Sequence, residues 1–326
     1  MPPHKTKDGS LQIWPRKRAE RIIPSVNWSV VNKKGLQGFI GYKVGMTSVY
    51  VKDNTNNSMT KGKKITMPAT ILECPSMKIY SVRFYKNGLV AKDLVVGFDD
   101  ELKHKLKKPK KIEGKIEDFK DFDDVRVIVY SIVKKTGIKK SPDIIEMALG
   151  GTKEEKISFI KEKIGKEISI SDVFQDGLVD VRGVTKGYGL QGPVKRFGIG
   201  LKSHKSEKGR RRPGSLAPWH PARVTFRTAM AGQTGYFTRI TYNNAILQIG
   251  KIKESNINVN GGFHQYGNIQ TDFIVLRGSV QGPAKRPLLM TPPIRPTKDQ
   301  TKRKFEVIEL RWKQNYMIKA ETQTKK

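Results

Sequence analysis

The sequence predicts a mainly β protein in which a small antiparallel barrel is combined with an α/β insertion and extended basic segments. Three observations support this prediction. Short runs of β-branched and aromatic residues, broken by glycines, fill residues 35–98. The same texture returns at residues 169–185 and 260–283. Between these two stretches lies a basic segment whose glycines and prolines exclude a long amphipathic helix.

The charge of the chain predicts the class of its partner. Its 326 residues include 63 Lys and Arg against 30 Asp and Glu, which gives a net charge of +33, and 37% of the residues are hydrophobic. A compact domain gains no stability from such a surplus, because like charges repel one another. The composition therefore predicts a polyanionic partner and favours nucleic acid over an anionic membrane surface.

Other classes of protein lack their signatures here. The most apolar run, VRVIVYSIV at residues 125–133, is too short to cross a bilayer, and the N-terminus lacks the apolar core of a signal peptide. The single cysteine, Cys74, excludes an internal disulfide and is expected to be buried at a strand end. The five histidines are scattered. We therefore expect a cytoplasmic protein with no metal, no cofactor, no membrane contact and no small-molecule substrate.

The texture of the sequence changes along the chain. Residues 1–34 form a basic, proline-rich N-terminal extension that is expected to order only on its partner. Residues 35–98 hold the first part of the barrel, and residues 99–171 form the α/β insertion, which carries 15 of the 30 acidic residues. The later segments are a barrel continuation, a basic central finger with a tryptophan tip, the completion of the barrel, and a C-terminal crossing with a last strand, at residues 172–194, 195–228, 229–290 and 291–326.

Local signals predict several elements. Asn87-Gly88 predicts a hairpin turn in the first part of the barrel. Within the insertion, Ser141-Pro142 predicts the start of a short helix that ends at Gly150. Thr152 and Glu155 predict a capping box for a second helix, and one strand at residues 125–133 is expected between the helical parts of the insertion.

The strongest functional signal surrounds the sequence RRRPGSLAPWHPARV at residues 210–224. Residues 182–253 hold fifteen Lys and Arg but one acid, Glu207. Arginine suits phosphate because its planar fork forms two parallel hydrogen bonds, and aromatic rings stack on unpaired RNA bases. The candidate RNA-binding residues are Arg16, Lys17, Arg18, Lys186, Lys195, Arg196, Lys202, Lys205, Lys208, Arg210, Arg211, Arg212, Trp219, His220, Arg223 and Arg227.

Two interpretations of Trp219 remain open at this point. Prolines on both sides of Trp219-His220 indicate a stiff tip that presents an aromatic plane to RNA. Alternatively, the indole forms a small local core under the loop.

Enzymatic functions find little support. GYGLQG at residues 187–192 matches the glycine pattern of a dinucleotide-binding loop, but Pro193 and a basic segment follow where a long helix is required. No nucleophile elbow, Walker A loop or zinc-protease motif is present. The alternatives to a structural RNA-binding protein are an RNA-modifying enzyme with a basic tail and an architectural DNA-binding protein. The enzyme would need a cofactor pocket, and the DNA-binding protein would prefer duplex DNA to folded RNA.

Five motifs in order resemble the ribosomal protein L3 family of the large subunit. They are GYKVGMTSVY (41–50), TMPATILECP (66–75), DVRGVTKGYGLQGPVKRFGI (180–199), AMAGQTGYFTRIT (229–241) and FIVLRGSVQGP (273–283). The stretch PWHPARVTFRTAMAGQTGY, the N-terminal arm and the insertion are similar to the archaeal and eukaryotic form, and the chain length favours the archaeal form.

The resemblance implies a fold and a function. The expected fold is a six-stranded translation-protein-type β-barrel with long arms that bind large-subunit, 23S-type rRNA near its 3′ end. It implies a structural role that begins early in subunit assembly, with a finger that approaches the peptidyl-transferase region and carries Trp219 at its tip. It also implies ribosomal proteins L14 and L24e as neighbours.

Overall fold

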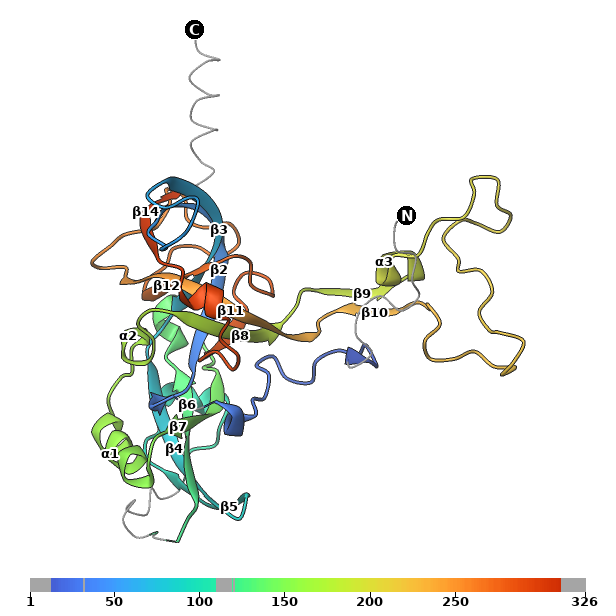
Figure 1. Ribbon diagram of the computed structural model, residues 1–326. Coiled ribbons are helices and arrows are strands. Elements are labelled where there is room, and N and C mark those ends of the chain that lie inside the picture. The colour runs from blue at the N-terminus through green and yellow to red at the C-terminus, as the bar shows by residue number, and fades with distance from the viewer. Residues whose placement is uncertain (1–12, 32, 110–118, 120, 312–326) are drawn as a thin grey trace. The chain divides into compact units, whose positions relative to one another are not determined.

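The computed structural model describes residues 13–31, 33–109, 119 and 121–311. The chain divides into two compact units, which are described separately below. The core unit comprises Ile23–Gly183 and Ile240–Lys326, and the basic unit comprises Met1–Ile22 and Val184–Arg239. Strands dominate the described residues and pair in antiparallel fashion (Figure 1), which confirms the prediction of a mainly β protein.

The larger sheet has the strand order β13-β8-β11-β12-β3-β2-β14, and β13 also pairs with β2. Its strands are β2 (Phe39–Asp53), β3 (Lys64–Cys74), β8 (Leu178–Val184), β11 (Thr238–Lys251), β12 (Asp272–Arg277), β13 (Pro287–Thr291) and β14 (Phe305–Arg311). These strands come from both ends of the chain sequence, as the recurrence of strand texture predicts. The C-terminal strand expected after residue 291 is β14.

The second sheet of the core unit has the order β1-β7-β6-β4-β5. Its strands are β1 (Gly35–Leu36), β4 (Met77–Lys86), β5 (Leu89–Val95), β6 (Asp124–Ser131) and β7 (Ile144–Gly150). Asn87 and Gly88 join β4 to β5 with φ values of 51° and 76°, so the predicted hairpin turn is confirmed. This sheet therefore unites β4 and β5 with strands of the acidic insertion.

One helix prediction is wrong. The segment after Ser141-Pro142 forms the strand β7, which pairs with β6 on one side and with β1 on the other. The pairing buries the side chains of Met147, Ala148 and Leu149. A proline near a putative helix start is a local signal, and long-range pairing on both edges overrides it.

The helices of the core unit are short. Thr152 caps α1 in a capping box with Glu155, as predicted: its hydroxyl accepts from the Glu155 amide, and the Glu155 carboxylate accepts from the Thr152 amide. Ile160 on α1 is fully buried. The helical elements are η2 (Trp28–Val30), η3 (Asp100–His104), η5 (Val133–Thr136), α1 (Lys153–Lys163), α2 (Ile170–Val173) and α4 (Lys298–Thr301).

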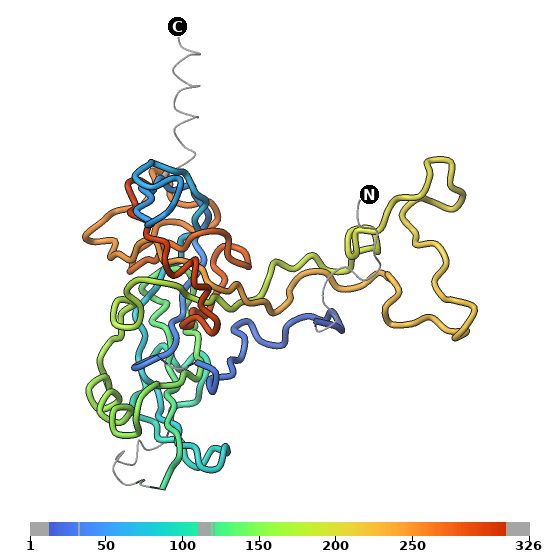
Figure 2. Tube along the Cα trace, viewed as in Figure 1, coloured from blue at the N-terminus to red at the C-terminus, as the bar shows by residue number. Residues whose placement is uncertain are grey.

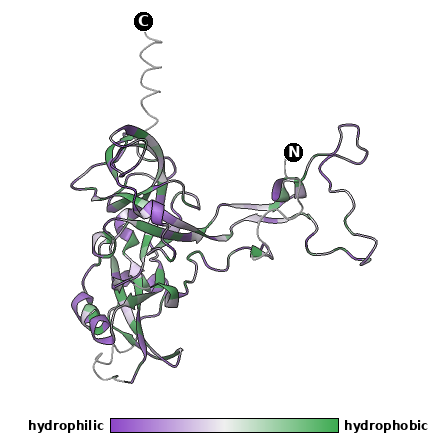
Figure 3. Cartoon of the chain, viewed as in Figure 1, coloured by the Kyte–Doolittle hydropathy of each residue, from purple (hydrophilic) through white to green (hydrophobic). Residues whose placement is uncertain are grey.

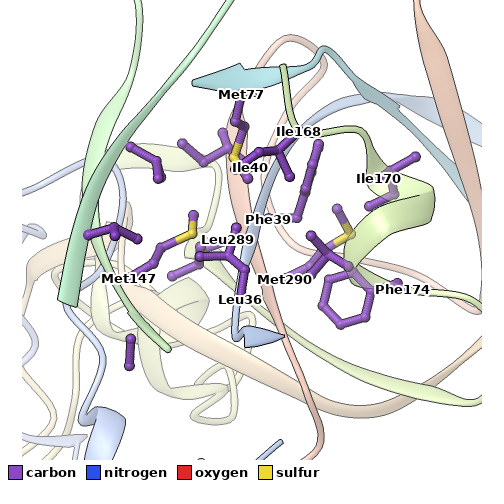
Figure 4. Packing of buried hydrophobic residues seen from close by; sticks show 14 of the residues in the cluster. Leu36, Phe39, Ile40, Met77, Met147, Ile168, Ile170, Phe174, Leu289 and Met290 are labelled. Atoms are coloured by element: carbon purple, nitrogen blue, oxygen red, sulfur yellow. The ribbon is translucent and has the colours of Figure 1, made fainter. Parts of the chain in front are cut away.

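Both sheets contribute to one hydrophobic cluster in the core unit. Figure 4 shows Leu36 and Met147 of the smaller sheet packed with Phe39 and Leu289 of the larger sheet. Trp28, from the predicted N-terminal extension, is also buried in this cluster. In Figure 3 the strands of this unit carry many hydrophobic residues, whereas α3 (Pro193–Phe197) of the basic unit is largely hydrophilic. The core that the 37% hydrophobic residues permit therefore lies mainly in this unit.

Glu73 on β3 is a fully buried carboxylate. Its Oε1 accepts hydrogen bonds from the backbone amides of Gln270 and Thr271, at 2.8 and 2.9 Å, and from the Thr271 hydroxyl. Its Oε2 accepts a hydrogen bond from the Tyr266 hydroxyl. Burial and the nearby Glu73 charge raise the pKa of Tyr266 well above its ordinary value, so the phenol stays a donor. This network fixes the loop before β12 against β3.

Cys74 should be unreactive in the folded protein. It is fully buried at the end of β3, as expected from the sequence, and burial raises the pKa of its thiol well above the ordinary value. We expect Ellman's reagent to label no thiol in native buffer and one thiol per chain in denaturant. Rapid labelling of the native protein would contradict the burial of Cys74.

Candidate nucleic-acid interface

A two-stranded ribbon and a short helix form the regular part of the basic unit. β9 (Gly187–Gln191) pairs in antiparallel fashion with β10 (Gly232–Gly235), and α3 (Pro193–Phe197) follows β9 directly (Figure 1). The sequence did not lead us to expect this helix. Proline is favourable at its first position, and Gly198 ends it with a φ of 67°. With five residues, α3 is far shorter than the helix of a dinucleotide-binding fold.

Residues 199–231 form a long loop without helix or strand, and the path of this loop can be followed in Figure 2. A few internal hydrogen bonds shape this loop. The Lys202 amide donates to the Arg210 carbonyl at 3.2 Å, and Arg210 Nε donates back to the Lys202 carbonyl at 3.1 Å. The Thr228 hydroxyl donates to the Leu216 carbonyl at 3.0 Å. So little internal bonding in so long a loop leaves its side chains available to a partner.

The N-terminal extension packs against the base of this loop. The Trp14 ring centroid lies 5.7 Å from that of Phe197 and 5.9 Å from that of Phe226. The Arg16 guanidinium lies 4.5 Å from the Phe197 centroid, and its Nη1 donates to the Arg196 carbonyl at 2.9 Å. The Ala19 amide donates to the Tyr236 carbonyl. Residues 14–19 therefore order on the protein itself, which corrects the expectation that the whole extension orders only on a partner.

Arg196 braces the base of the loop. Its Nε donates to the Gln233 carbonyl and its Nη1 to the Met230 carbonyl, both at 3.1 Å. Partial burial lowers the pKa of Arg196 from its ordinary value. A Cβ atom at Gly232 would lie 2.6 Å from the guanidinium carbon, so a larger residue at this position requires the end of the Arg196 side chain to shift. The fork of Arg196 thus joins α3 to the start of β10.

The structure places the sequence-predicted residues in two groups. Arg16, Arg196 and Lys202 are half-buried and bonded within the unit. The exposed candidates are Lys17, Arg18, Lys186, Lys195, Lys205, Lys208, Arg210, Arg211, Arg212, Trp219, His220, Arg223 and Arg227. These exposed side chains lie in the N-terminal segment, directly before β9, on α3 and along the loop at residues 199–231.

Trp219 is 88% exposed. Its one ring neighbour among the described residues is His220, with centroids 6.3 Å apart and ring planes at 89°. The interpretation of Trp219 as a local protein core is therefore wrong for this structure. An indole in water is unfavourable unless a partner covers it.

Charge is strongly one-sided in the basic unit. Residues 13–22 and 184–239 hold 16 Lys and Arg but only two acids, Glu20 and Glu207. Glu20 lies 3.6 Å from Lys17, and both side chains are solvent-exposed. An exposed pair of this kind neutralises little of the field around the loop. An excess of positive charge along an extended loop suits a polyanionic partner.

The sequence of the chain matches a family of known proteins. The sequence profile of the family described as Ribosomal protein L3 matches residues 1–109 and 81–318. The large ribosomal subunit protein uL3 of Archaeoglobus fulgidus is 41% identical over 312 residues, which cover 90% of this chain and 93% of the relative. The uL3 proteins of Methanocaldococcus jannaschii and Methanococcus vannielii are 41% and 38% identical, over 90% and 92% of this chain. The chain belongs to the ribosomal protein L3 family.

Membership of the L3 family confirms the resemblance predicted from the five motifs. The relatives are named as ribosomal proteins, which agrees with the prediction that the chain is not an enzyme. Among the described residues, no helix is long and apolar enough to cross a membrane. The same residues contain no group of three side chains suited to a metal ion.

Sequence reasoning missed the apolar part of the L3 interface. Tyr188 and Leu190 on β9 are 62% and 77% exposed, and Phe226 in the loop is 71% exposed. Apolar side chains in a segment without a core were a usable signal. Together with the exposed basic residues, these side chains would offer a nucleic acid both charge and stacking surface.

Proposed function

We propose that this L3-family chain is a structural component of the large ribosomal subunit and a primary rRNA-binding protein. It binds near the 3′ end of the 23S-type rRNA, nucleates subunit assembly, and extends its basic finger towards the peptidyl-transferase region. One observation carries the proposal: a loop with no helix or strand holds eight of the 16 basic residues of its unit and a single acid, Glu207. A surface of this kind becomes stable when phosphates neutralise it.

The mechanism is electrostatic. Lys and Arg along the loop replace the counterions of crowded phosphates, and the released counterions favour binding. Arg210, Arg211 and Arg212 are adjacent and exposed, so their forks can contact successive phosphates or stack on bases. Trp219 supplies a plane for a base. Arg16 and Arg196 hold the base of the loop in place, so they act as positioning residues.

The core unit anchors the protein. We infer that β2, β3, β12, β11, β8 and β13 close into a six-stranded barrel of the translation-protein type. The pairing of β13 with both β8 and β2 supports this inference, because it connects the two ends of the strand row. Proteins L14 and L24e are the proposed neighbours of this unit.

Sedimentation tests the proposed function. The tagged full-length chain, expressed in an archaeal host, should comigrate with the large-subunit peak of a gradient at moderate salt. A chain found only at the top of the gradient would contradict the proposal. Competition with duplex DNA separates the alternatives: a DNA-binding protein would lose its RNA to duplex DNA, whereas an rRNA-binding protein would keep it.

Replacing Trp219 with alanine should separate stability from function. Because the indole is 88% exposed, Trp219→Ala should change the free energy of unfolding by less than about 0.5 kcal/mol. Loss of a stacked base should weaken rRNA binding by about 1–3 kcal/mol, measured by filter binding. Phe197→Ala is the matched control, because it removes a buried ring and should lower stability. A large stability loss in Trp219→Ala would mean that the indole packs on protein.

A further inference from the structure

A polar cleft lies in the core unit. Its volume is about 420 Å³, and it lies between the turn after β2 and the segment from α4 to β14. The basic side chains on its wall are Arg277, Lys302 and Arg303. The lining also includes a run of hydroxyl and amide side chains in the turn after β2: Thr55, Asn56, Asn57, Ser58 and Thr60.

Two arginines converge on this cleft. Arg277 ends β12, is half-buried, and holds its guanidinium carbon 5.2 Å from the centroid of the Phe305 ring. Burial and the positive charge of Arg303 lower the pKa of Arg277. Arg303 is exposed and follows α4. Two cations that repel one another in the lining of one cleft gain stability when an anion binds beside both.

The acids at the cleft do not fill that role. Asp53 Oδ1 accepts from the Thr55 amide at 2.9 Å, while its Oδ2 accepts from the hydroxyls of Ser58, at 2.8 Å, and Thr60. These hydrogen bonds hold the pKa of Asp53 well below its ordinary value, so the carboxylate stays ionised. Both carboxylate oxygens of Asp53 accept hydrogen bonds within the turn that follows β2. The charge of Asp53 therefore acts on Arg277 only at longer range. Asp299, the other acid of the cleft, is exposed to solvent.

We propose that this cleft binds a phosphate group of the RNA backbone between Arg277 and Arg303. The proposal rests on the proposed rRNA-binding function and adds a contact in the core unit, outside the basic unit. The arginine forks match phosphate oxygens, and charge-assisted hydrogen bonds of this kind are the strong ones. The hydroxyl and amide side chains that also line the cleft suit the polar sugar-phosphate chain. Arg277 already covers the Phe305 ring, so a phosphate suits the cleft better than a stacked base.

Binding of the full-length chain to deproteinised large-subunit rRNA tests the proposal. The variant Arg277→Gln/Arg303→Gln is compared with Lys140→Gln/Lys166→Gln, which removes the same charge from exposed positions of the same unit. One lost phosphate contact should lower the salt slope of log K by about 0.7–0.9, or about fivefold to eightfold in affinity at 0.1 M salt, beyond the control. Hydroxyl-radical footprinting should lose one protected site, while protections that depend on Arg210, Arg211 and Arg212 remain.

Two further variants keep the test independent of folding. Arg303→Gln alone changes an exposed side chain and should retain the wild-type melting curve while it lowers affinity. Arg277→Lys/Arg303→Lys keeps the charge and should recover part of the affinity. If Arg277→Gln/Arg303→Gln gave the same affinity and footprint as the control Lys140→Gln/Lys166→Gln, the proposal would be overturned. The proposal would also be overturned if the variant were incorporated poorly into the large ribosomal subunit but bound rRNA with unchanged affinity, because that result would identify a protein as the partner of the cleft. If the wild-type chain itself fails to bind rRNA, the proposed function fails instead.

Discussion

Replacing Arg210, Arg211 and Arg212 together with glutamine is expected to weaken rRNA binding about 100-fold at 0.1 M salt. The three side chains are exposed and adjacent in a loop without helix or strand. If each neutralises one phosphate of single-stranded RNA, each contributes about −0.7 to the slope of log K against log salt concentration. The slope should therefore become shallower by about 2. Filter binding over a salt series measures both quantities.

The control for this experiment keeps the charge and changes its geometry. Replacing the same three arginines with lysine should preserve most of the salt slope but lose affinity, because lysine lacks the planar fork. Folding should be unaffected in both variants. A glutamine variant with an unchanged slope would show that these arginines contact no phosphate.

Glu73→Ala is expected to lower the free energy of unfolding of the core unit by about 3–5 kcal/mol. The alanine would leave the Gln270 and Thr271 amides and the Tyr266 hydroxyl without their acceptor in a buried place. Buried donors without partners carry the full cost of desolvation. Urea unfolding followed by circular dichroism measures the loss.

Glu254→Ala is the matched control for the buried acid. Glu254 also lies in the core unit, but its side chain is 72% exposed and lies 3.6 Å from Lys251. Its loss should change stability by less than about 0.5 kcal/mol. Equal effects of the two substitutions would mean that the network around Glu73 adds nothing to the stability of the fold.

Local signals in the sequence identified the elements that local interactions determine. Asn87-Gly88 requires positive φ angles, and Thr152 with Glu155 satisfies its own helix start, so both are legible without the rest of the chain. The strand β7 was misread because its state depends on β6 and β1, which are distant in sequence. The pairing of β4 and β5 with β6 was also outside the reach of local patterns.

The basic loop was predicted in its composition more than in its architecture. Charge density located the loop and the exposed arginines, because repulsion among like charges is a property of composition. The sequence did not show that Arg16 and Arg196 brace the base of the loop. Their hydrogen-bond partners lie 180 and 37 residues away along the chain. Trp14 was not singled out, although its ring packs on Phe197 and Phe226.

The close approach of Arg196 to Gly232 has a consequence for the evolution of the family. A Cβ atom at position 232 would lie 2.6 Å from the Arg196 guanidinium carbon, so a larger residue there requires the end of the Arg196 side chain to shift. Such a shift would weaken the hydrogen bonds from the guanidinium to the Met230 and Gln233 carbonyls. The two positions are therefore coupled. Homologues with another residue at position 232 are expected to hold the base of the loop by a different set of contacts.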